Sequence, residues 1–362
     1  MGVITENTAA LQAPSGITET LYTICPVLVA SNVALELGWL DEEFKKAGAS
    51  ARYLRSLTGP KDWLPHYNHD SDRLIRDGGN SPAVGARADV RPTTLIGLTQ
   101  AQPAGKIIVR VDSGINKVSD LKGRRVALYR SALTDKLDHR RATGHHGLLA
   151  ALDLHGLDRN DLVWTDIVDD ESDEFHGKQA AARPSELWAR RRAAQSGFGL
   201  SIEAKALRDG VADAYYDYSV GIAGSLEETG KFKVIEDLDR YPDWTLRIAN
   251  APRTITVSTE FAERHPEVVV AFLRAAIRAG RWINANPEAA SEIFQRVTVY
   301  PCAKAIAKAL AQYDLVPNLS ARNLAGLEIE KNFLLQHRYI RNDFDVRQWA
   351  DHRYLEEALK GL

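Results

Sequence analysis

Cys25 is the residue with the clearest capacity for chemistry, because it stands where one predicted element ends and the next begins. Residues 21–25 (LYTIC) are apolar and rich in β-formers, and residues 27–40 carry apolar side chains at helical spacing, with Pro26 suited to a first helical turn. The positive end of a helix and a nearby cation favour the thiolate form of cysteine, which is the nucleophile. A lone cysteine at a strand end is more often a small buried apolar residue, so the position alone leaves both interpretations open.

An arginine followed by a glycine pair is the second candidate feature. Arg76 lies just before Gly78 and Gly79, and a short helical pattern follows at residues 81–89. A guanidinium group matches two oxygens of an oxyanion, and N–H groups at a helix start bind anions where glycine allows close approach. The alternatives are that Arg76 pairs with a neighbouring aspartate, that Arg73 is the anion ligand, or that the glycines form only a tight turn.

A histidine lies between these two features along the chain. His66 could give or take the proton of a thiol, or orient it, but His69 competes for this role and a loop histidine is often only a packing residue. His145 and His146 point to different sides of a predicted helix and have no cysteine near them. We therefore interpret them as surface residues and predict no metal site.

Three tyrosines end a predicted strand in the middle of the chain. Strand alternation places Tyr216 and Tyr218 on one face and Tyr215 on the other. Such residues either pack in the core or form the aromatic wall of a ligand cleft. Their position at the end of the strand makes Tyr216 and Tyr218 candidate substrate contacts.

The elements that must position these residues alternate between strand and helix. Strands are predicted at residues 21–25, 51–57, 94–100, 106–111, 162–168, 231–238 and 254–259, with 94–100 and 106–111 forming a pair. This alternation is typical of α/β proteins, whose parallel sheets are covered by helices on both faces. We therefore predict two α/β lobes with a ligand cleft between them, the first from residues 16–110 and 252–362 and the second from residues 111–251.

The composition excludes several classes of protein. The chain has 362 residues, with 46 Lys+Arg against 48 Asp+Glu and no basic tail, which argues against a general nucleic-acid binder. No apolar run reaches the ~18 residues of a membrane span, and two cysteines are too few for a zinc ribbon or a disulfide scaffold. Residues 1–16 lack the features of an export signal, which predicts a flexible lead-in and a cytoplasmic protein, or a periplasmic one if a signal had been removed.

Four stretches resemble the solute-binding proteins of nitrate, sulfonate and thiamine-precursor transporters. They are residues 35–48 (LELGWLDEEFKKAG), 119–128 (SDLKGRRVAL), 210–218 (GVADAYYDY) and 258–282 (STEFAERHPEVVVAFLRAAIRAGRW). The resemblance covers nearly the whole chain. It implies the type II periplasmic-binding-protein-like fold, in which two α/β lobes are joined by two crossovers and enclose a ligand cleft.

Within this superfamily the chain resembles the aromatic sulfinate desulfinases of dibenzothiophene desulfurisation. The resemblance rests on YTICP with Cys25, on LPHYNHD with His66, on IRDGGNSPAV with Arg76, and on the C-terminal stretch at residues 332–355. It implies that Cys25, His66 and Arg76 are catalytic and that the partner is a small aromatic sulfinate or a related oxyanion. It implies neither a metal nor an organic cofactor.

The same resemblance makes Thr23, Ser71, Gly78 and Gly79 candidate substrate contacts. Two positions depart from the desulfinase pattern. Ile24 stands where a polar side chain is expected, and Ser71 stands where a larger amide is expected. Both departures bear on which substrate is bound more than on which reaction occurs.

The function implied by the resemblance is hydrolysis of an aryl carbon–sulfur bond with release of sulfite. In one route the Cys25 thiolate attacks sulfur and water resolves the enzyme adduct. In the other, Cys25 protonates the ring carbon while sulfur dioxide leaves and is hydrated. The alternative function is that of an oxyanion-binding receptor, similar to sulfonate or nitrate receptors, which passes its ligand to the permease of an ABC transporter.

Overall fold

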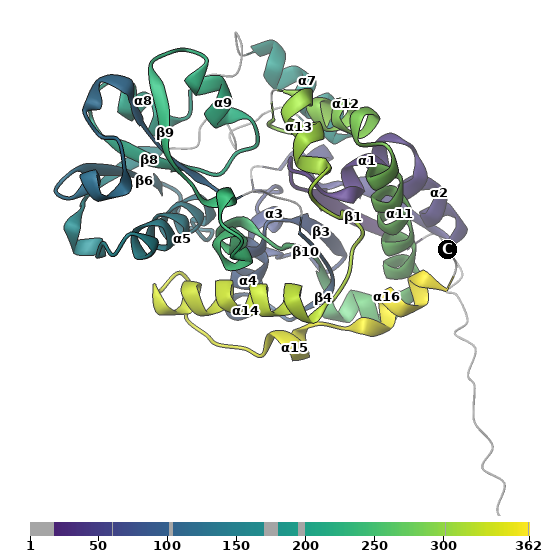
Figure 1. Ribbon diagram of the computed structural model, residues 1–362. Coiled ribbons are helices and arrows are strands. Elements are labelled where there is room, and N and C mark those ends of the chain that lie inside the picture. The colour runs from purple at the N-terminus through teal and green to yellow at the C-terminus, as the bar shows by residue number, and fades with distance from the viewer. Residues whose placement is uncertain are drawn as a thin grey trace, which may run out of the picture.

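The computed structural model describes residues 18–59, 61–100, 104–169, 180–194, 200–300, 302–360 and 362, so the predicted lead-in at residues 1–16 lies outside the described ranges. Its named strands form two five-stranded sheets, each at the centre of one lobe (Figure 1). From edge to edge, the first sheet contains β2 (Ala49–Tyr53), β1 (Thr18–Ile24), β3 (Leu74–Gly78), β10 (Arg253–Ser258) and β4 (Thr93–Thr99). The second contains β7 (Val163–Asp169), β6 (Arg125–Ser131), β8 (Ala214–Asp217), β5 (Lys106–Arg110) and β9 (Phe232–Asp237).

The two sheets share one internal arrangement. In the first, β10 runs antiparallel to its neighbours β3 and β4, and in the second β5 runs antiparallel to β8 and β9. The other strand pairs are parallel. Each of these antiparallel strands is the first strand that the chain forms after it crosses from the other sheet. It therefore begins at the edge of the sheet where the neighbouring strands end. The expectation of purely parallel sheets was therefore wrong for one strand in each sheet.

The chain crosses from the first sheet to the second between β4 and β5, and returns between β9 and β10. The predicted pairing of residues 94–100 with residues 106–111 is wrong, because these strands belong to different sheets. Residues 106–110 therefore lie with the second lobe, although the predicted boundary placed them in the first. A periodic pattern identifies a strand, but it does not identify the strand's partner.

Helices cover both sheets (Figure 1). Those of the first lobe are α1 (Ala30–Glu36), α2 (Trp39–Lys46), α3 (Pro65–Asn68), α4 (Asn80–Asp89), α10 (Thr259–Arg264), α11 (Pro266–Ala285), α12 (Pro287–Val297), α13 (Ala303–Leu310), α14 (Ala321–Gln336), α15 (Val346–Trp349) and α16 (His352–Leu359). The second lobe has α5 (His139–Leu154), α8 (Ile202–Arg208) and α9 (Ile222–Glu227), whereas α7 (Pro184–Ala194) follows β7 but packs against α12. Among the described residues, no helix is long and apolar enough to cross a membrane.

Two helical patterns are interrupted by single residues. The pattern at residues 27–40 becomes α1 and α2, because Gly38 adopts a left-handed conformation with φ of +75° between them. The helical pattern predicted at residues 261–286 is likewise divided at Pro266, which begins α11 directly after α10, because proline fits the first turn of a helix but not its interior.

The first lobe has the larger core. Helix α11 packs against α1, α2 and α16, and its apolar face is fully enclosed. Phe272 on α11 and Phe294 on α12 have no exposed surface, and burial of each ring contributes about 2–3 kcal/mol of transfer free energy. This core supports the strand ends that carry the candidate site.

A buried carboxylate joins the two lobes beside the cleft. Glu330 on α14 accepts a hydrogen bond from Ser81 Oγ on α4 at 2.8 Å, and its other oxygen lies 2.8 Å from His146 Nδ1 on α5. His145 is buried, with its ring 5.5 Å from that of Phe333, and the His146 side chain is 14% exposed. The interpretation of these two histidines as surface residues was wrong, because the packing of α5 against the first lobe covers them.

Candidate active site

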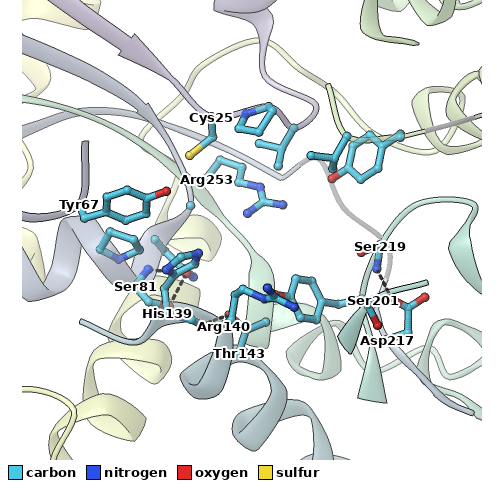
Figure 2. A pocket seen from close by; sticks show the side chains of 18 of the residues that line it. Cys25, Tyr67, Ser81, His139, Arg140, Thr143, Ser201, Asp217, Ser219 and Arg253 are labelled. Atoms are coloured by element: carbon cyan, nitrogen blue, oxygen red, sulfur yellow. Dashed lines mark hydrogen bonds between the residues drawn. The ribbon is translucent and has the colours of Figure 1, made fainter. Parts of the chain in front are cut away.

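A cavity of about 290 Å³ lies between the lobes and is lined by both (Figure 2). From the first lobe it receives the end of β1, helix α3, the segment from β3 into α4, and the start of β10. From the second lobe it receives α5, the start of α8 and the end of β8. Its lining includes Cys25, His66, Tyr67, Arg76, Gly79, His139, Arg140, Glu203, Asp217, Tyr218 and Arg253.

Cys25 follows the last residue of β1 and turns its sulfur into this cavity. Its backbone N–H donates to the Asp77 carbonyl at 2.8 Å, and its own carbonyl accepts from Asn32 Nδ2 at 3.0 Å. Helix α1 begins only at Ala30, so the expectation that Pro26 occupies a first helical turn next to the thiol was wrong. The sulfur lies 3.2 Å from His66 Nε2 and 3.8 Å from an Arg76 nitrogen, Nη2.

His66 is held from both sides of its ring. Its side chain lies on the short helix α3, and its Nδ1 is 2.6 Å from Thr23 Oγ1 while its Nε2 faces the thiol. Burial lowers the pKa of His66 well below its usual value of 6.5, and the nearby Arg76 cation lowers it further. The imidazole is therefore uncharged near neutral pH, with one nitrogen able to donate and the other able to accept.

Arg76 is 1% exposed and is held mainly by backbone carbonyls. Its Nε donates to the His66 carbonyl at 2.7 Å, and its Nη1 donates to the Gly79 carbonyl at 2.9 Å. Nε and Nη1 of the guanidinium are thus occupied by backbone carbonyls, and Nη2 is the nitrogen directed at the Cys25 sulfur. We had expected Arg76 to make a bidentate contact with an anion. The structure differs, because the sequence does not show which carbonyls surround the arginine.

Gly78 and Gly79 place backbone directly beside the reactive groups. A Cβ on Gly78 would lie 2.2 Å from the Cys25 sulfur, so only glycine fits there. Gly79 is the N-cap of α4, so the first turn of that helix borders the cavity. A Cβ on Gly79 would meet only Arg253 Nη1, at 3.4 Å.

This contrast predicts different outcomes for two alanine substitutions. Gly78→Ala should displace the Cys25 thiol and reduce kcat/KM for an aryl sulfinate by about 100-fold or more, because small displacements of reacting groups have effects of that order. Gly79→Ala, whose Cβ has room, should stay within a few-fold of the natural protein. Steady-state kinetics of both variants, with circular dichroism as a folding check, would test this. Similar activity in the two variants would contradict the importance of the thiol's position.

Thr23 does not line the cavity, but its hydroxyl lies where it can orient the His66 imidazole. Thr23→Val removes the hydroxyl at 2.6 Å from His66 Nδ1 without changing the side chain's shape, so we expect kcat to fall about 10-fold or more with little change in KM. Thr23→Ser should restore most of the activity. Thr20→Val is the matched control, because it removes another buried hydroxyl from β1, one that donates to the Arg73 carbonyl at 2.8 Å. Equal kinetics for the two valine variants would rule out an orienting role.

Three other residues considered from the sequence, Ser71, His69 and Arg73, do not line the Cys25 cavity. Ser71 lies against a separate hollow formed with Arg73 and Arg264, and the structure does not bring it to the Cys25 cavity. His69 is buried but does not line this cavity, and Arg73 forms an ion pair with Glu19 at 2.8 Å.

The two tyrosine candidates have different surroundings. Both line the cavity, but the Tyr216 ring is packed between Gly105 and Gly147 and its hydroxyl accepts from the Gly105 N–H at 2.9 Å. Tyr218 is half-buried and lies at the end of the strand, where it faces the cavity. Tyr216 therefore serves largely as core, whereas Tyr218 is placed as an aromatic wall.

Several cavity residues were not identified from the sequence. Arg253 begins β10 and is 4% exposed, and it approaches the site from a strand far along the chain. A charged residue at the head of an otherwise uncharged strand was the available signal. His139, Arg140 and Asp217 come from the second lobe, and nothing local in the sequence relates them to Cys25. The described residues include no group of three or more His, Cys, Asp or Glu side chains that could hold a metal ion.

Comparison with known proteins gives two kinds of relative, although no protein-family model matches the chain. A 2'-hydroxybiphenyl-2-sulfinate desulfinase from Rhodococcus erythropolis is 28% identical over 376 residues, and the match covers 95% of each chain. A solved structure of a cysteine-to-serine mutant of DSZB in complex with biphenyl-2-sulfinic acid superposes with a TM-score of 0.74 at 23% identity, covering 95% of this chain and 99% of that one. The periplasmic aliphatic sulphonate binding protein SsuA from Escherichia coli gives a TM-score of 0.62 at 18% identity, covering 91% and 96%.

These comparisons confirm two predictions made from the sequence. The resemblance to a sulfinate desulfinase extends over nearly the whole chain. The two-lobed periplasmic-binding-protein-like fold is confirmed, since both DSZB and a periplasmic sulfonate-binding protein superpose on it along more than nine tenths of the chain.

Proposed function

We propose that this protein is an aromatic sulfinate desulfinase, which hydrolyses the carbon–sulfur bond of an aryl sulfinate and releases an arene and sulfite. The observation that carries the proposal is the Cys25 thiol, which faces an uncharged buried imidazole at 3.2 Å and a buried guanidinium at 3.8 Å within a cavity. Similarity over 95% of the chain to a desulfinase supports the same reaction.

The reaction balances with water as the only co-substrate. In the nucleophilic route, the Cys25 sulfur bonds to the sulfinate sulfur while the aryl–sulfur bond breaks, and the aryl carbon takes a proton to become the arene. Water then attacks the adduct, which frees hydrogen sulfite and restores the thiol. In the second route Cys25 protonates the ring carbon, and the sulfur dioxide that leaves is hydrated. His66 exchanges a proton with Cys25 in either route, and no net oxidation or reduction occurs.

The sulfinate anion would be held at the end of the cavity that contains Cys25. Arg253 provides positive charge there, next to the Arg76 nitrogen that faces the thiol. Because Arg76 is held by two carbonyls, its position is set before substrate arrives, as electrostatic stabilisation of a charged intermediate requires.

Sulfite release is the direct test of this function. The purified protein should release equimolar sulfite and biphenyl from biphenyl-2-sulfinate, at a rate proportional to protein concentration. A thiol-reactive dye for sulfite and chromatography for the arene would measure both products. Binding of the sulfinate without formation of either product would contradict the proposal.

Capture of a sulfonate-like oxyanion is the second candidate function, and the shared fold with a sulfonate-binding protein favours it. Calorimetric titration with short alkanesulfonates would detect it, and tight binding without turnover of any aryl sulfinate would support it. A thiol–imidazole contact gives a receptor no evident advantage, so we place this function second. If the protein is a receptor, we predict an ABC permease as its partner. If it is a desulfinase, we predict a cytoplasmic location.

A further inference from the structure

The groups around Cys25 have the arrangement of a catalytic triad for acyl transfer. The Cys25 sulfur lies 3.2 Å from His66 Nε2, and His66 Nδ1 lies 2.6 Å from Thr23 Oγ1. A nucleophile, a base in contact with it and a third group that orients the base recur together in hydrolases of unrelated folds. A proton on Nδ1 would donate to Thr23 Oγ1 and leave Nε2 as the acceptor for the proton of the thiol. Burial lowers the pKa of His66 well below 6.5, so the imidazole is uncharged near neutral pH and can take this proton.

Arg76 lies where the negative charge of an acyl-transfer intermediate would develop. Attack of a thiolate on a carbonyl carbon leaves the carbonyl oxygen next to the sulfur, as an oxyanion. The Arg76 nitrogen Nη2 is 3.8 Å from the sulfur and can donate to that oxygen, and the carbonyls bonded to Nε and Nη1 fix its position beforehand. Arg253, a second buried cation in the cavity lining, adds positive charge. The site therefore combines a nucleophile–base pair with a group that stabilises an oxyanion.

The cavity also suits a neutral aryl ester. Cys25 is a free and partly exposed cysteine, and Tyr67, Tyr218, Pro26 and Val27 line the cavity with it. Figure 2 shows Cys25 and Tyr67 on the same side of the cavity. An aryl ester is an easier substrate for a thiolate than an aryl sulfinate, because its leaving group is a phenol with a pKa of about 10, whereas the sulfinate must release a far more basic aryl carbon.

We propose that this site has a second activity, the thiol-dependent hydrolysis of aryl esters. The Cys25 sulfur bonds to the carbonyl carbon while its proton passes to His66. The bond between that carbon and the aryl oxygen then breaks, and the oxygen takes the proton and leaves as a phenol. Water attacks the acyl-thioester and passes a proton to His66, and the carbon–sulfur bond breaks to release a carboxylic acid and restore the thiol. Water is the only co-substrate, and nothing is oxidised or reduced.

Hydrolysis of 4-nitrophenyl acetate tests this activity. The natural protein should release a burst of about one equivalent of 4-nitrophenolate per chain and then turn over steadily, because acylation of Cys25 precedes a slower hydrolysis of the thioester. The rate constant for acylation should exceed that of N-acetylcysteine at the same pH by about 100-fold or more, since a positioned base contributes effects of that order. Mass spectrometry of peptides from protein quenched during the burst should place the acetyl group on Cys25.

Variants separate the triad from a merely reactive thiol. Cys25→Ser should abolish the burst, whereas Cys302→Ser should leave it unchanged, because Cys302 is exposed and does not line the cavity. Thr23→Val should slow acylation by about 10-fold and Thr23→Ser should restore it, since the orienting hydroxyl acts only through the imidazole.

Three results would overturn the proposal: acylation no faster than that of N-acetylcysteine, an acetyl group on Cys302 instead of Cys25, or an acetyl-enzyme that water does not hydrolyse. The inference rests on the geometry of the site and not on the proposed sulfinate activity, so sulfite release from biphenyl-2-sulfinate is measured separately. Sulfite release without ester hydrolysis would overturn the esterase activity and leave the desulfinase function standing. Ester hydrolysis without sulfite release would support the esterase activity and contradict the desulfinase function.

Discussion

Cys25→Ser protein should release sulfite from aryl sulfinates at least about 1,000-fold more slowly than the natural protein, because loss of an activated nucleophile or proton donor has effects of that order or larger. The hydroxyl of serine is a far weaker nucleophile and acid than a thiol held 3.2 Å from an imidazole. The aryl sulfinate should still bind, since the groups around the anion are unchanged. Single-turnover sulfite release and calorimetric affinity would separate these two effects.

Cys302 provides the matched control. It is exposed and forms the N-cap position of α13, where it makes no side-chain cap hydrogen bond. Cys302→Ser should therefore keep full activity, which excludes a general effect of removing a thiol. Near-normal turnover of Cys25→Ser protein would remove Cys25 from the mechanism under both routes.

Arg76→Lys should lower kcat/KM by about 100-fold and destabilise the fold by about 2–4 kcal/mol, because a lysine cannot reproduce the spread of donors that arginine supplies. The guanidinium joins the His66 carbonyl, the Gly79 carbonyl and the Cys25 sulfur in one rigid plane. A single ammonium group keeps the charge but cannot reach all three. The carbonyls left without donors are buried, which is the cause of the expected loss of stability.

Urea unfolding and steady-state kinetics would test both parts of this prediction under conditions where the variant stays folded. Arg73→Lys is the control, because Arg73 is half exposed and pairs with Glu19 at the surface. It should change neither quantity measurably. Full activity combined with reduced stability in Arg76→Lys protein would show that Arg76 only supports the fold.

The sequence, through its resemblance to the desulfinases, was sufficient to group Cys25, His66 and Arg76, although the strand that carries Arg76, β3, was not predicted. Cys25 follows β1 and Arg76 lies on β3 just before α4, and these two strands are parallel neighbours in the first sheet. Parallel neighbours end at the same edge of a sheet, so residues at their carboxyl ends meet there. His66 lies in the connection that leads into β3, which keeps it within reach of both.

The tertiary structure alone decided which strands pair and what faces the thiol across the cavity. β4 and β5 follow one another in sequence yet lie in different sheets, and β10 brings Arg253 back to the first sheet in an antiparallel direction. Asp217 reaches the cavity only because the second lobe packs against the first. Hydrophobic periodicity reports how each segment is buried, whereas the partner of a strand and the apposition of two lobes depend on contacts between residues far apart in sequence.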